Sequence, residues 1–193
     1  MKIILGSASP RRNQLLSLIV RDFEVIVSDF KEVATENRPT FVAVELAEQK
    51  ARAVYKLVES VEEALIIGAD TIVFTEKILG KPENRNDAFE MLKSLSDRTH
   101  SVVTGVCIKS SLTGIEECFY SETKVEFVKL SEELIWRYIN SGEPMDKAGA
   151  YGIQGMGARF IKNINGCYYN VVGLPVQKLS EVLESMGFCE LLP

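Results

Sequence analysis

Two hydroxyls and two guanidinium groups stand close together near the start of the chain. They belong to Ser7, Ser9, Arg11 and Arg12, and they follow the expected strand Lys2–Gly6. Free backbone N–H groups and the positive end of a helix dipole face a loop in this position. Guanidinium groups pair well with phosphate oxygens, so the pattern predicts an anion site, most simply for phosphate. A capped helix with exposed arginines explains the same residues, and the spacing of a Walker A loop is absent.

A carboxylate and an ammonium group stand at the ends of strand-like runs further along the chain. Asp70 lies in Gly68-Ala69-Asp70-Thr71, after the expected strand Ala64–Gly68. A rigid strand that ends at a binding site holds a catalytic or metal-binding carboxylate in place. Lys81 lies in Gly80-Lys81-Pro82, where a stiff loop would hold its charge against a phosphate. An Asp in an ordinary turn and a merely exposed Lys are the alternatives.

Four glycines and several polar side chains lie among the fifteen residues from Ser141 to Gly155. Glycine allows the backbone to approach a ligand closely, and an ordinary flexible surface loop is the competing interpretation. Gln154 stands near the end of this stretch, and its amide offers both a donor and an acceptor. The stretch therefore predicts a second binding segment, in which Gln154 would read the edge of a base.

The elements that must hold these residues alternate between strands and helices. Periodicity and caps predict helices after Ser9, from Thr40, after Asn84 or Asn86, from Ser131 and from Pro175. Strands are expected over Lys2–Gly6, Phe23–Val27, Ala64–Gly68, Thr71–Phe74, Ile78–Gly80, His100–Ser110 and Glu116–Val128, and a hairpin over Arg159–Ile164 and Cys167–Val172. The chain of 193 residues has the length of one domain, and the pattern predicts a mixed α/β fold.

Composition limits the classes of function. Hydrophobic residues make up 46% and charged residues 25%, which is typical of a soluble globular protein. The net charge of −5 argues against a nucleic-acid partner, since such binding needs a basic surface. The opening apolar run is too short for a signal peptide, and no run has the length of a membrane span. We therefore expect a cytoplasmic protein with no membrane partner.

The remaining reactive residue types carry less information. Cys107, Cys118, Cys167 and Cys189 are scattered, so free thiols in a reducing compartment are expected. His100 is the only histidine, which rules out a histidine-rich zinc site. No nucleophile elbow accompanies it, so a structural role is expected.

Six motifs stand in an order that resembles the Maf family. They are Ser7-Ala8-Ser9-Pro10-Arg11-Arg12, Gly68-Ala69-Asp70-Thr71, Gly80-Lys81-Pro82, Arg98-Thr99-His100, the run from Asp146 to Gly155, and Val172-Gly173-Leu174-Pro175. The resemblance covers nearly the whole chain. It implies an α/β fold similar to the inosine triphosphatase type, with one domain of two lobes over residues 1–193 and a cleft between the lobes. It also implies a divalent-metal-dependent nucleoside triphosphate pyrophosphatase, and a homodimer as an expected assembly.

The resemblance also implies roles for individual residues. Asp70 corresponds to the family's proton acceptor. Lys50, Lys81 and Glu32 correspond to positions around the triphosphate and metal, so Mg²⁺ or Mn²⁺ is expected between Asp70 and Glu32. Arg12, Thr71 and Gln154 correspond to positions that choose the substrate.

The residue types at two of these positions indicate the branch of the family. Thr71 and Gln154 resemble the branch that hydrolyses dTTP and UTP, whereas a methylated-guanosine branch has Gln and Glu there. Modified pyrimidine nucleotides are further candidate substrates. The alternatives are a 7-methyl-GTP pyrophosphatase, a phosphomonoesterase with Asp70 as nucleophile, a nucleotide-binding regulatory module that acts on cell division without turnover, and an RNA-binding protein. The D-x-D-x-T pattern that such phosphomonoesterases use is missing.

Overall fold

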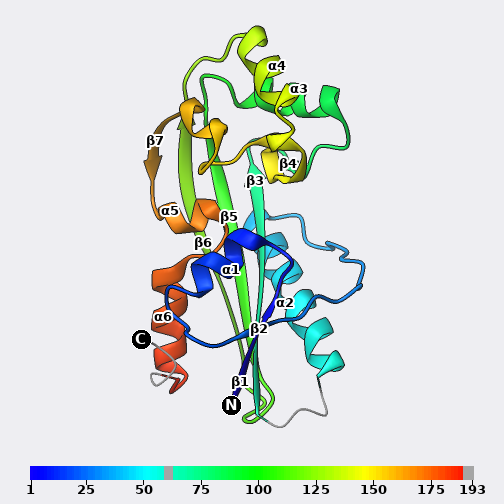
Figure 1. The fold of residues 1–193 in the computed structure, drawn as a ribbon, viewed down its shortest axis with the longest axis vertical. Coiled ribbons are helices and arrows are strands. Elements are labelled where there is room, and N and C mark those ends of the chain that lie inside the picture. Colours follow the sequence, from blue (N-terminus) through cyan, green and yellow to red (C-terminus); the bar gives the residue numbers. More distant parts are fainter. Residues whose placement is uncertain (59–62, 189–193) are drawn as a thin grey trace. The chain divides into compact units, whose positions relative to one another are not determined.

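The computed structural model describes residues 1–58 and 63–188 (Figure 1). The chain divides into two compact units. Unit 1 comprises Met1–Asp70, Thr104–Ser121 and Gly173–Pro193, and unit 2 comprises Thr71–Val103 and Glu122–Val172. The boundary inside one strand separates Asp70 from Thr71, so the residues expected to act on a substrate are distributed over both units.

The strands form one mixed sheet in the order β2-β1-β3-β5-β6-β7, with β4 paired to β3. Their bounds are Lys2–Gly6 (β1), Glu24–Val25 (β2), Ala64–Phe74 (β3), Ile78–Leu79 (β4), Thr99–Ser110 (β5), Glu116–Phe127 (β6) and Ile161–Asn165 (β7). β1 pairs in parallel with β2 and β3, while β3–β4 and β6–β7 are antiparallel. The expected mixed α/β fold is confirmed. The runs Ala64–Gly68 and Thr71–Phe74, expected as separate pieces, are one strand.

In unit 1, the helix α2 (Pro39–Leu57) packs against the sheet. Its fully buried residues Ala43, Ala47 and Ala51 recur every four positions and form a narrow seam. Glycines on the sheet receive this seam: a Cβ at Gly105 would collide with the backbone of Ala43, and one at Gly68 would collide with the carbonyl of Ala47. Small residues on both sides therefore allow the helix backbone to contact the sheet.

Two further helices belong to unit 1. Ser9 caps α1 (Pro10–Leu16), as expected, by accepting a hydrogen bond from the Arg12 N–H. α1 ends before Leu18, whose side chain is exposed. α6 (Val176–Ser185) begins after Pro175, as expected, and buries Leu179 and Leu183. Within residues 1–58 and 63–188, no helix is both long and apolar enough to cross a membrane.

Unit 2 has its own apolar core between α3 (Arg85–Leu95), α4 (Glu132–Asn140) and its part of the sheet. Asn84 and Ser131 cap these two helices through their side chains, as their types predict. The stretch after α4 forms three short 3₁₀ helices: η1 (Glu143–Asp146), η2 (Ala148–Ala150) and η3 (Met156–Phe160). The stretch for which a flexible surface loop was the competing interpretation therefore contains a series of short helical turns.

The hairpin expected over residues 159–172 is wrong. Its first half contains β7, but Tyr168–Val172 is a helix, α5, and β7 pairs with β6 instead. Side-chain hydrogen bonds with residues outside this segment hold the helix and the residue before it. The Thr123 hydroxyl binds both the N–H and the C=O of Cys167 at 3.0 Å, and the buried Asn170 amide donates to the Val102 carbonyl at 3.0 Å.

The expectation of free thiols is wrong for two of the cysteines. Cys107 on β5 and Cys118 on β6 form a disulfide, with Cα atoms 4.1 Å apart. They are eleven positions apart in sequence, and neither composition nor spacing revealed that the β5–β6 turn brings them together. Cys167 is free, as expected. Cys189 lies outside the described residues.

Candidate functional site

Three predicted site residues of unit 1 meet at the ammonium group of Lys50. Lys50 Nζ lies 2.5 Å from Asp70 Oδ1 and 3.2 Å from Glu32 Oε2. The side chains of Lys50 and Asp70 are 18% and 16% exposed, and that of Glu32 is 35% exposed, so the group is accessible but partly shielded. Two carboxylates that share one cation are costly to assemble without a functional reason, since each loses water contacts.

The contact between α2 and β3 places Lys50 next to Asp70. On β3, alternate residues point to the same face of the sheet. Gly68 faces α2, because a Cβ there would stand 2.7 Å from the Ala51 nitrogen, and Asp70 lies two residues further along. Lys50 precedes Ala51 on the helix. The close contact between the helix and Gly68 therefore brings the lysine to the carboxylate.

The segment that carries Glu32 has no regular structure and is tied to α2 by side chains. Gln49 accepts from the Val33 N–H at 3.1 Å and donates to the Val33 carbonyl at 2.7 Å. Glu45 accepts from the Thr35 hydroxyl at 2.5 Å and from its N–H at 2.9 Å. The hydroxyl of Thr35 is the main cause that lowers the pKa of Glu45. Because Gln49 is adjacent to Lys50, this connection places Glu32 at the same ammonium group.

Internal hydrogen bonds hold the arginine-containing loop of unit 1, so its two arginines are not both free at the surface. The Arg12 guanidinium donates through Nη1 to the Ser7 hydroxyl at 3.0 Å and through Nε to the Gly173 carbonyl at 2.9 Å. Ser9 caps the helix, and its own N–H donates to Ser7 at 3.3 Å. Arg12 is therefore fixed inside unit 1 and is not one of two exposed arginines. Arg11 is half-buried beside it.

The carboxylates that contact Lys50 also interact electrostatically with the arginine-containing loop. Burial lowers the pKa of Arg12, with Asp70 and Glu32 opposing this shift and Arg11 adding to it. Arg12 stays charged at neutral pH all the same, since a guanidinium deprotonates only under strongly alkaline conditions. Unit 1 thus brings Lys50, Arg11 and Arg12 into the same electrostatic environment as two carboxylates. Such a set can hold a polyanion and a divalent cation together.

The other predicted site residues belong to unit 2. Thr71 follows Asp70 in β3 and is half-buried, and both Lys81 and Gln154 are exposed. The segments that carry Lys81 and Gln154 meet in unit 2, because the Gly149 N–H donates to the Gly80 carbonyl at 3.0 Å. The part of unit 2 that carries Lys81 is therefore connected to the glycine-rich stretch that carries Gln154.

His100 has the structural role that was expected. Its ring is buried, lies 2.7 Å from the Tyr151 hydroxyl through Nε2, and packs edge-on against Phe127. Burial lowers its pKa to about 4, so the imidazole is neutral at pH 7. Tyr151 belongs to the glycine-rich stretch, which is thereby anchored to β5. Trp136 stacks on Phe89 in the same unit.

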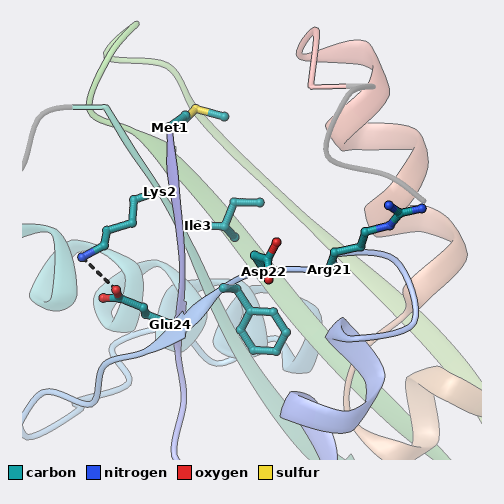
Figure 2. Close-up of a pocket in the computed structure, with 7 residues that line it drawn as sticks. Met1, Lys2, Ile3, Arg21, Asp22 and Glu24 are labelled. Carbon is teal, nitrogen blue, oxygen red and sulfur yellow. Dashed lines mark ion pairs between the residues drawn. The ribbon is translucent and has the colours of Figure 1, made fainter.

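A pocket of about 330 Å³ opens elsewhere in unit 1 and contains none of these residues (Figure 2). It is lined by Met1, Lys2, Ile3, Arg21, Asp22, Phe23 and Glu24. Lys2 and Glu24 are paired across 2.8 Å. Charges of both signs line it without converging on one point, so we assign the chemistry to the Lys50 group and not to this pocket.

Sequence reasoning overlooked several residues that hold the site. Gly173 was recognised only as part of a motif, yet its carbonyl fixes Arg12. Gln49 and Glu45 had no signal, because polar residues on the exposed face of a helix are common. Glu143 is the third residue of the stretch that begins at Ser141. It accepts hydrogen bonds from the Tyr138 hydroxyl and the Met156 N–H, which lie just before and just after that stretch.

Known proteins resemble this chain over nearly its full length. A family model described as "Maf-like protein" matches residues 2–186. A dTTP/UTP pyrophosphatase of Clostridium botulinum is 51% identical over 189 residues, which cover 96% of this chain and 97% of the relative. A dTTP/UTP pyrophosphatase of Thermococcus kodakarensis is 50% identical over 187 residues, with the same coverage.

Among solved structures, a HAM1 protein from Coxiella burnetii aligns with a TM-score of 0.53 at 17% identity. The alignment covers 96% of this chain and 99% of that one, and it supports the fold alone. The family model and the two relatives are decisive for classification, because each spans almost the entire chain. The chain belongs to the Maf family.

Proposed function

We propose that this protein hydrolyses dTTP and UTP to the nucleoside monophosphate and pyrophosphate. The observation that carries the proposal is the Lys50 ammonium group held between Asp70 and Glu32. Support for the reaction and the substrates comes from the names of relatives that are about half identical over almost the whole chain. Thr71 and Gln154 are the residue types expected in that branch.

The reaction is attack by water on the α-phosphorus. A bond forms between the water oxygen and this phosphorus, the bond to the α,β-bridging oxygen breaks, and pyrophosphate leaves. Asp70 accepts the proton of the attacking water. Lys50 orients the Asp70 carboxylate through the 2.5 Å contact and balances negative charge near the reacting phosphate.

The acidic residues of unit 1 fit a divalent cation. The carboxylates of Asp70 and Glu32 lie near each other, since both contact the Lys50 ammonium group, and hard cations such as Mg²⁺ and Mn²⁺ prefer carboxylate ligands. These two residues would hold the ion. When bound, it would lower the pKa of water and neutralise phosphate charge.

The remaining predicted residues divide between phosphate and base. Arg11, Arg12, Ser7 and Ser9 supply cationic and hydroxyl donors for phosphate oxygens, with Arg12 fixed by its bond to Gly173. Lys81 supplies a further cation for the triphosphate. Thr71 and Gln154 are proposed to select the base, because a pyrimidine with two carbonyls and an N3–H needs both donors and acceptors.

The test is a substrate panel with purified protein and Mg²⁺ or Mn²⁺. Each common nucleoside triphosphate and 7-methyl-GTP is supplied, and pyrophosphate and inorganic phosphate are quantified separately. We expect pyrophosphate from dTTP and UTP, and a loss of at least about 100-fold in kcat for Asp70→Asn. The matched control is Asp22→Asn, at an exposed carboxylate of unit 1, which should retain activity.

Each other outcome contradicts a defined part of the proposal. Release of inorganic phosphate alone would indicate a phosphomonoesterase. Turnover mainly of 7-methyl-GTP would overturn the substrate assignment and keep the reaction. Nucleotide binding without turnover by the folded protein would replace the enzyme with a binding module.

A further inference from the structure

The chain after α4 folds around the carboxylate of Glu143. Oε1 accepts a hydrogen bond from the Tyr138 hydroxyl at 2.9 Å, and Oε2 accepts one from the Met156 N–H at 2.8 Å. The Gly157 N–H adds a bond to Oε1 at 3.3 Å. Both oxygens are therefore used, and two of the three donors are backbone groups 13 and 14 residues further along the chain.

The residues around this carboxylate are small because the chain passes very close to it. A Cβ at Gly155 would collide with the Glu143 carboxylate. A Cβ at Gly157 would stand 2.7 Å from the Gly152 carbonyl and 2.9 Å from the Tyr138 hydroxyl. Close packing against the Glu143 carboxylate at Gly155, and against Gly152 and Tyr138 at Gly157, therefore accounts for glycine at these two positions without any ligand.

The electrostatics agree with a carboxylate that works as an acceptor. Partial burial favours the neutral acid, but hydrogen bonds from Met156, Tyr138 and Gly157 outweigh it, so the pKa of Glu143 lies below its ordinary value. Lys147 contributes in the same direction, although its ammonium group contacts the Glu143 carbonyl and Asp146 and not the carboxylate itself. Glu143 is therefore ionised at neutral pH and can accept from several donors at once.

Gln154 lies inside the segment that Glu143 holds. Its side chain is exposed and has no hydrogen-bond partner among residues 1–58 and 63–188. A side chain without partners of its own takes its position from its backbone. That backbone is fixed on one side by the core residue Tyr151, bound to His100, and on the other by the bonds of Met156 and Gly157 to Glu143.

We propose that Glu143 is the positioning residue for Gln154 and thereby sets the base preference of the enzyme. This inference rests on the proposed function, because it assumes that Gln154 contacts the base of a nucleoside triphosphate. Loss of the carboxylate would leave the Met156 and Gly157 N–H groups without their acceptor and free the 152–157 segment. The Gln154 amide would then be delivered to the base less accurately, and discrimination that depends on paired donors and acceptors would fall.

The test compares Glu143→Gln with Glu133→Gln. The two substitutions make the same chemical change, and Glu133 is a surface residue of α4 with an 81% exposed side chain. We measure kcat and KM for dTTP, UTP, CTP and dATP, together with hydrogen exchange of the amides at residues 156 and 157. Glu143→Gln should accelerate exchange there and lower the ratio of kcat/KM for dTTP over CTP at least about tenfold, mainly through KM. Glu133→Gln should change neither.

A double substitution separates positioning from general damage. If Glu143 acts through Gln154, then in a Gln154→Ala background Glu143→Gln should cause no further loss of the dTTP-over-CTP ratio. Equal losses in both backgrounds, or an unchanged ratio in the single variant, would overturn the inference while the wild type still releases pyrophosphate. A wild-type protein that releases none would instead overturn the proposed function.

Discussion

A methyl group on Gly68 would stand 2.7 Å from the backbone nitrogen of Ala51. This is closer than ordinary van der Waals contact allows, so helix and strand touch here without side chains between them. Lys50 and Asp70 flank this contact on the helix and on the strand, and their 2.5 Å bond depends on it. The distance between the two charged groups is therefore set by an interaction that involves neither of them.

The substitution Gly68→Ala should damage stability and activity together. The added methyl group has to push α2 away from β3, and overpacking of this kind costs about 1–3 kcal/mol of unfolding free energy. The same movement separates Lys50 from Asp70, so kcat should fall as well. Urea unfolding and pyrophosphate release measure the two effects. Gly80→Ala is the control for stability, because nothing lies within 4 Å of a Cβ there, and a similar loss in it would contradict this account.

Lys50 and Asp70 should behave as one functional unit in a double-mutant cycle. We expect Lys50→Met and Asp70→Asn each to lower kcat at least about 100-fold, since each removes one half of a charge-assisted contact. The double variant should be no slower than the slower single variant, because groups that act together are not additive. Multiplicative losses would mean that the two residues contribute independently.

Substitution of Thr71 and Gln154, the two residues that indicate the branch of the family, should shift the substrate preference. The double substitution Thr71→Gln with Gln154→Glu replaces both by the types of the methylated-guanosine branch. A glutamate offers acceptors only, so it loses the donor that a pyrimidine carbonyl requires. The ratio of kcat/KM for dTTP over 7-methyl-GTP should fall at least about tenfold. An unchanged ratio would remove Thr71 and Gln154 from base selection.

Stability should decrease as the pH falls below 6.5 because of His100. The native imidazole has a pKa of about 4, whereas the unfolded chain binds its proton near the ordinary value of 6.5. Between these values the unfolded state holds more protons, so unfolding becomes more favourable as the pH drops. From pH 7 to pH 5 the free energy of unfolding should fall by about 2 kcal/mol from this group.

The matched measurement uses His100→Gln, which has no group that titrates in this range. Chemical denaturation at pH 7, 6 and 5 should give a flatter dependence for the variant than for the wild type. The variant should also be less stable at pH 7, since the contact with Tyr151 is altered. Parallel curves for the two proteins would assign the pH dependence to other groups.

Local signals in the sequence were sufficient for much of the fold. Ser9, Asn84 and Ser131 are capping residues followed by helical spacing, and each caps the helix that was expected. Such predictions succeed because the cap and the helix are neighbours in the chain. The wrong hairpin after residue 158 failed for the opposite reason: Thr123 and Val102, far away in sequence, supply the hydrogen bonds that hold α5 and its first turn.

In the candidate site too, local sequence signals identified some residues, whereas contacts between distant parts of the chain could not be predicted. Asp70 could be singled out at the end of an apolar run, and Lys50 and Glu32 only through a family resemblance. Nothing near Lys50 reveals that Gly68 will lie beneath Ala51, or that Gln49 will bind the segment after Glu32. These contacts follow from the packing of α2 on the sheet, which depends on the whole of unit 1. The same holds for the pairing of Cys107 with Cys118 across two strands.

The continuity of β3 limits how this chain can change in length. Asp70 and Thr71 are consecutive residues of one strand from Ala64 to Phe74, so their side chains leave it on opposite faces. Insertion or deletion of one residue between Ala64 and Asp70 would turn the carboxylate away from Lys50 and bring Ala69 or Thr71 toward it. Proteins that keep this chemistry must therefore accommodate insertions and deletions elsewhere, and the turn between β5 and β6 is a position where they would leave Asp70 in place.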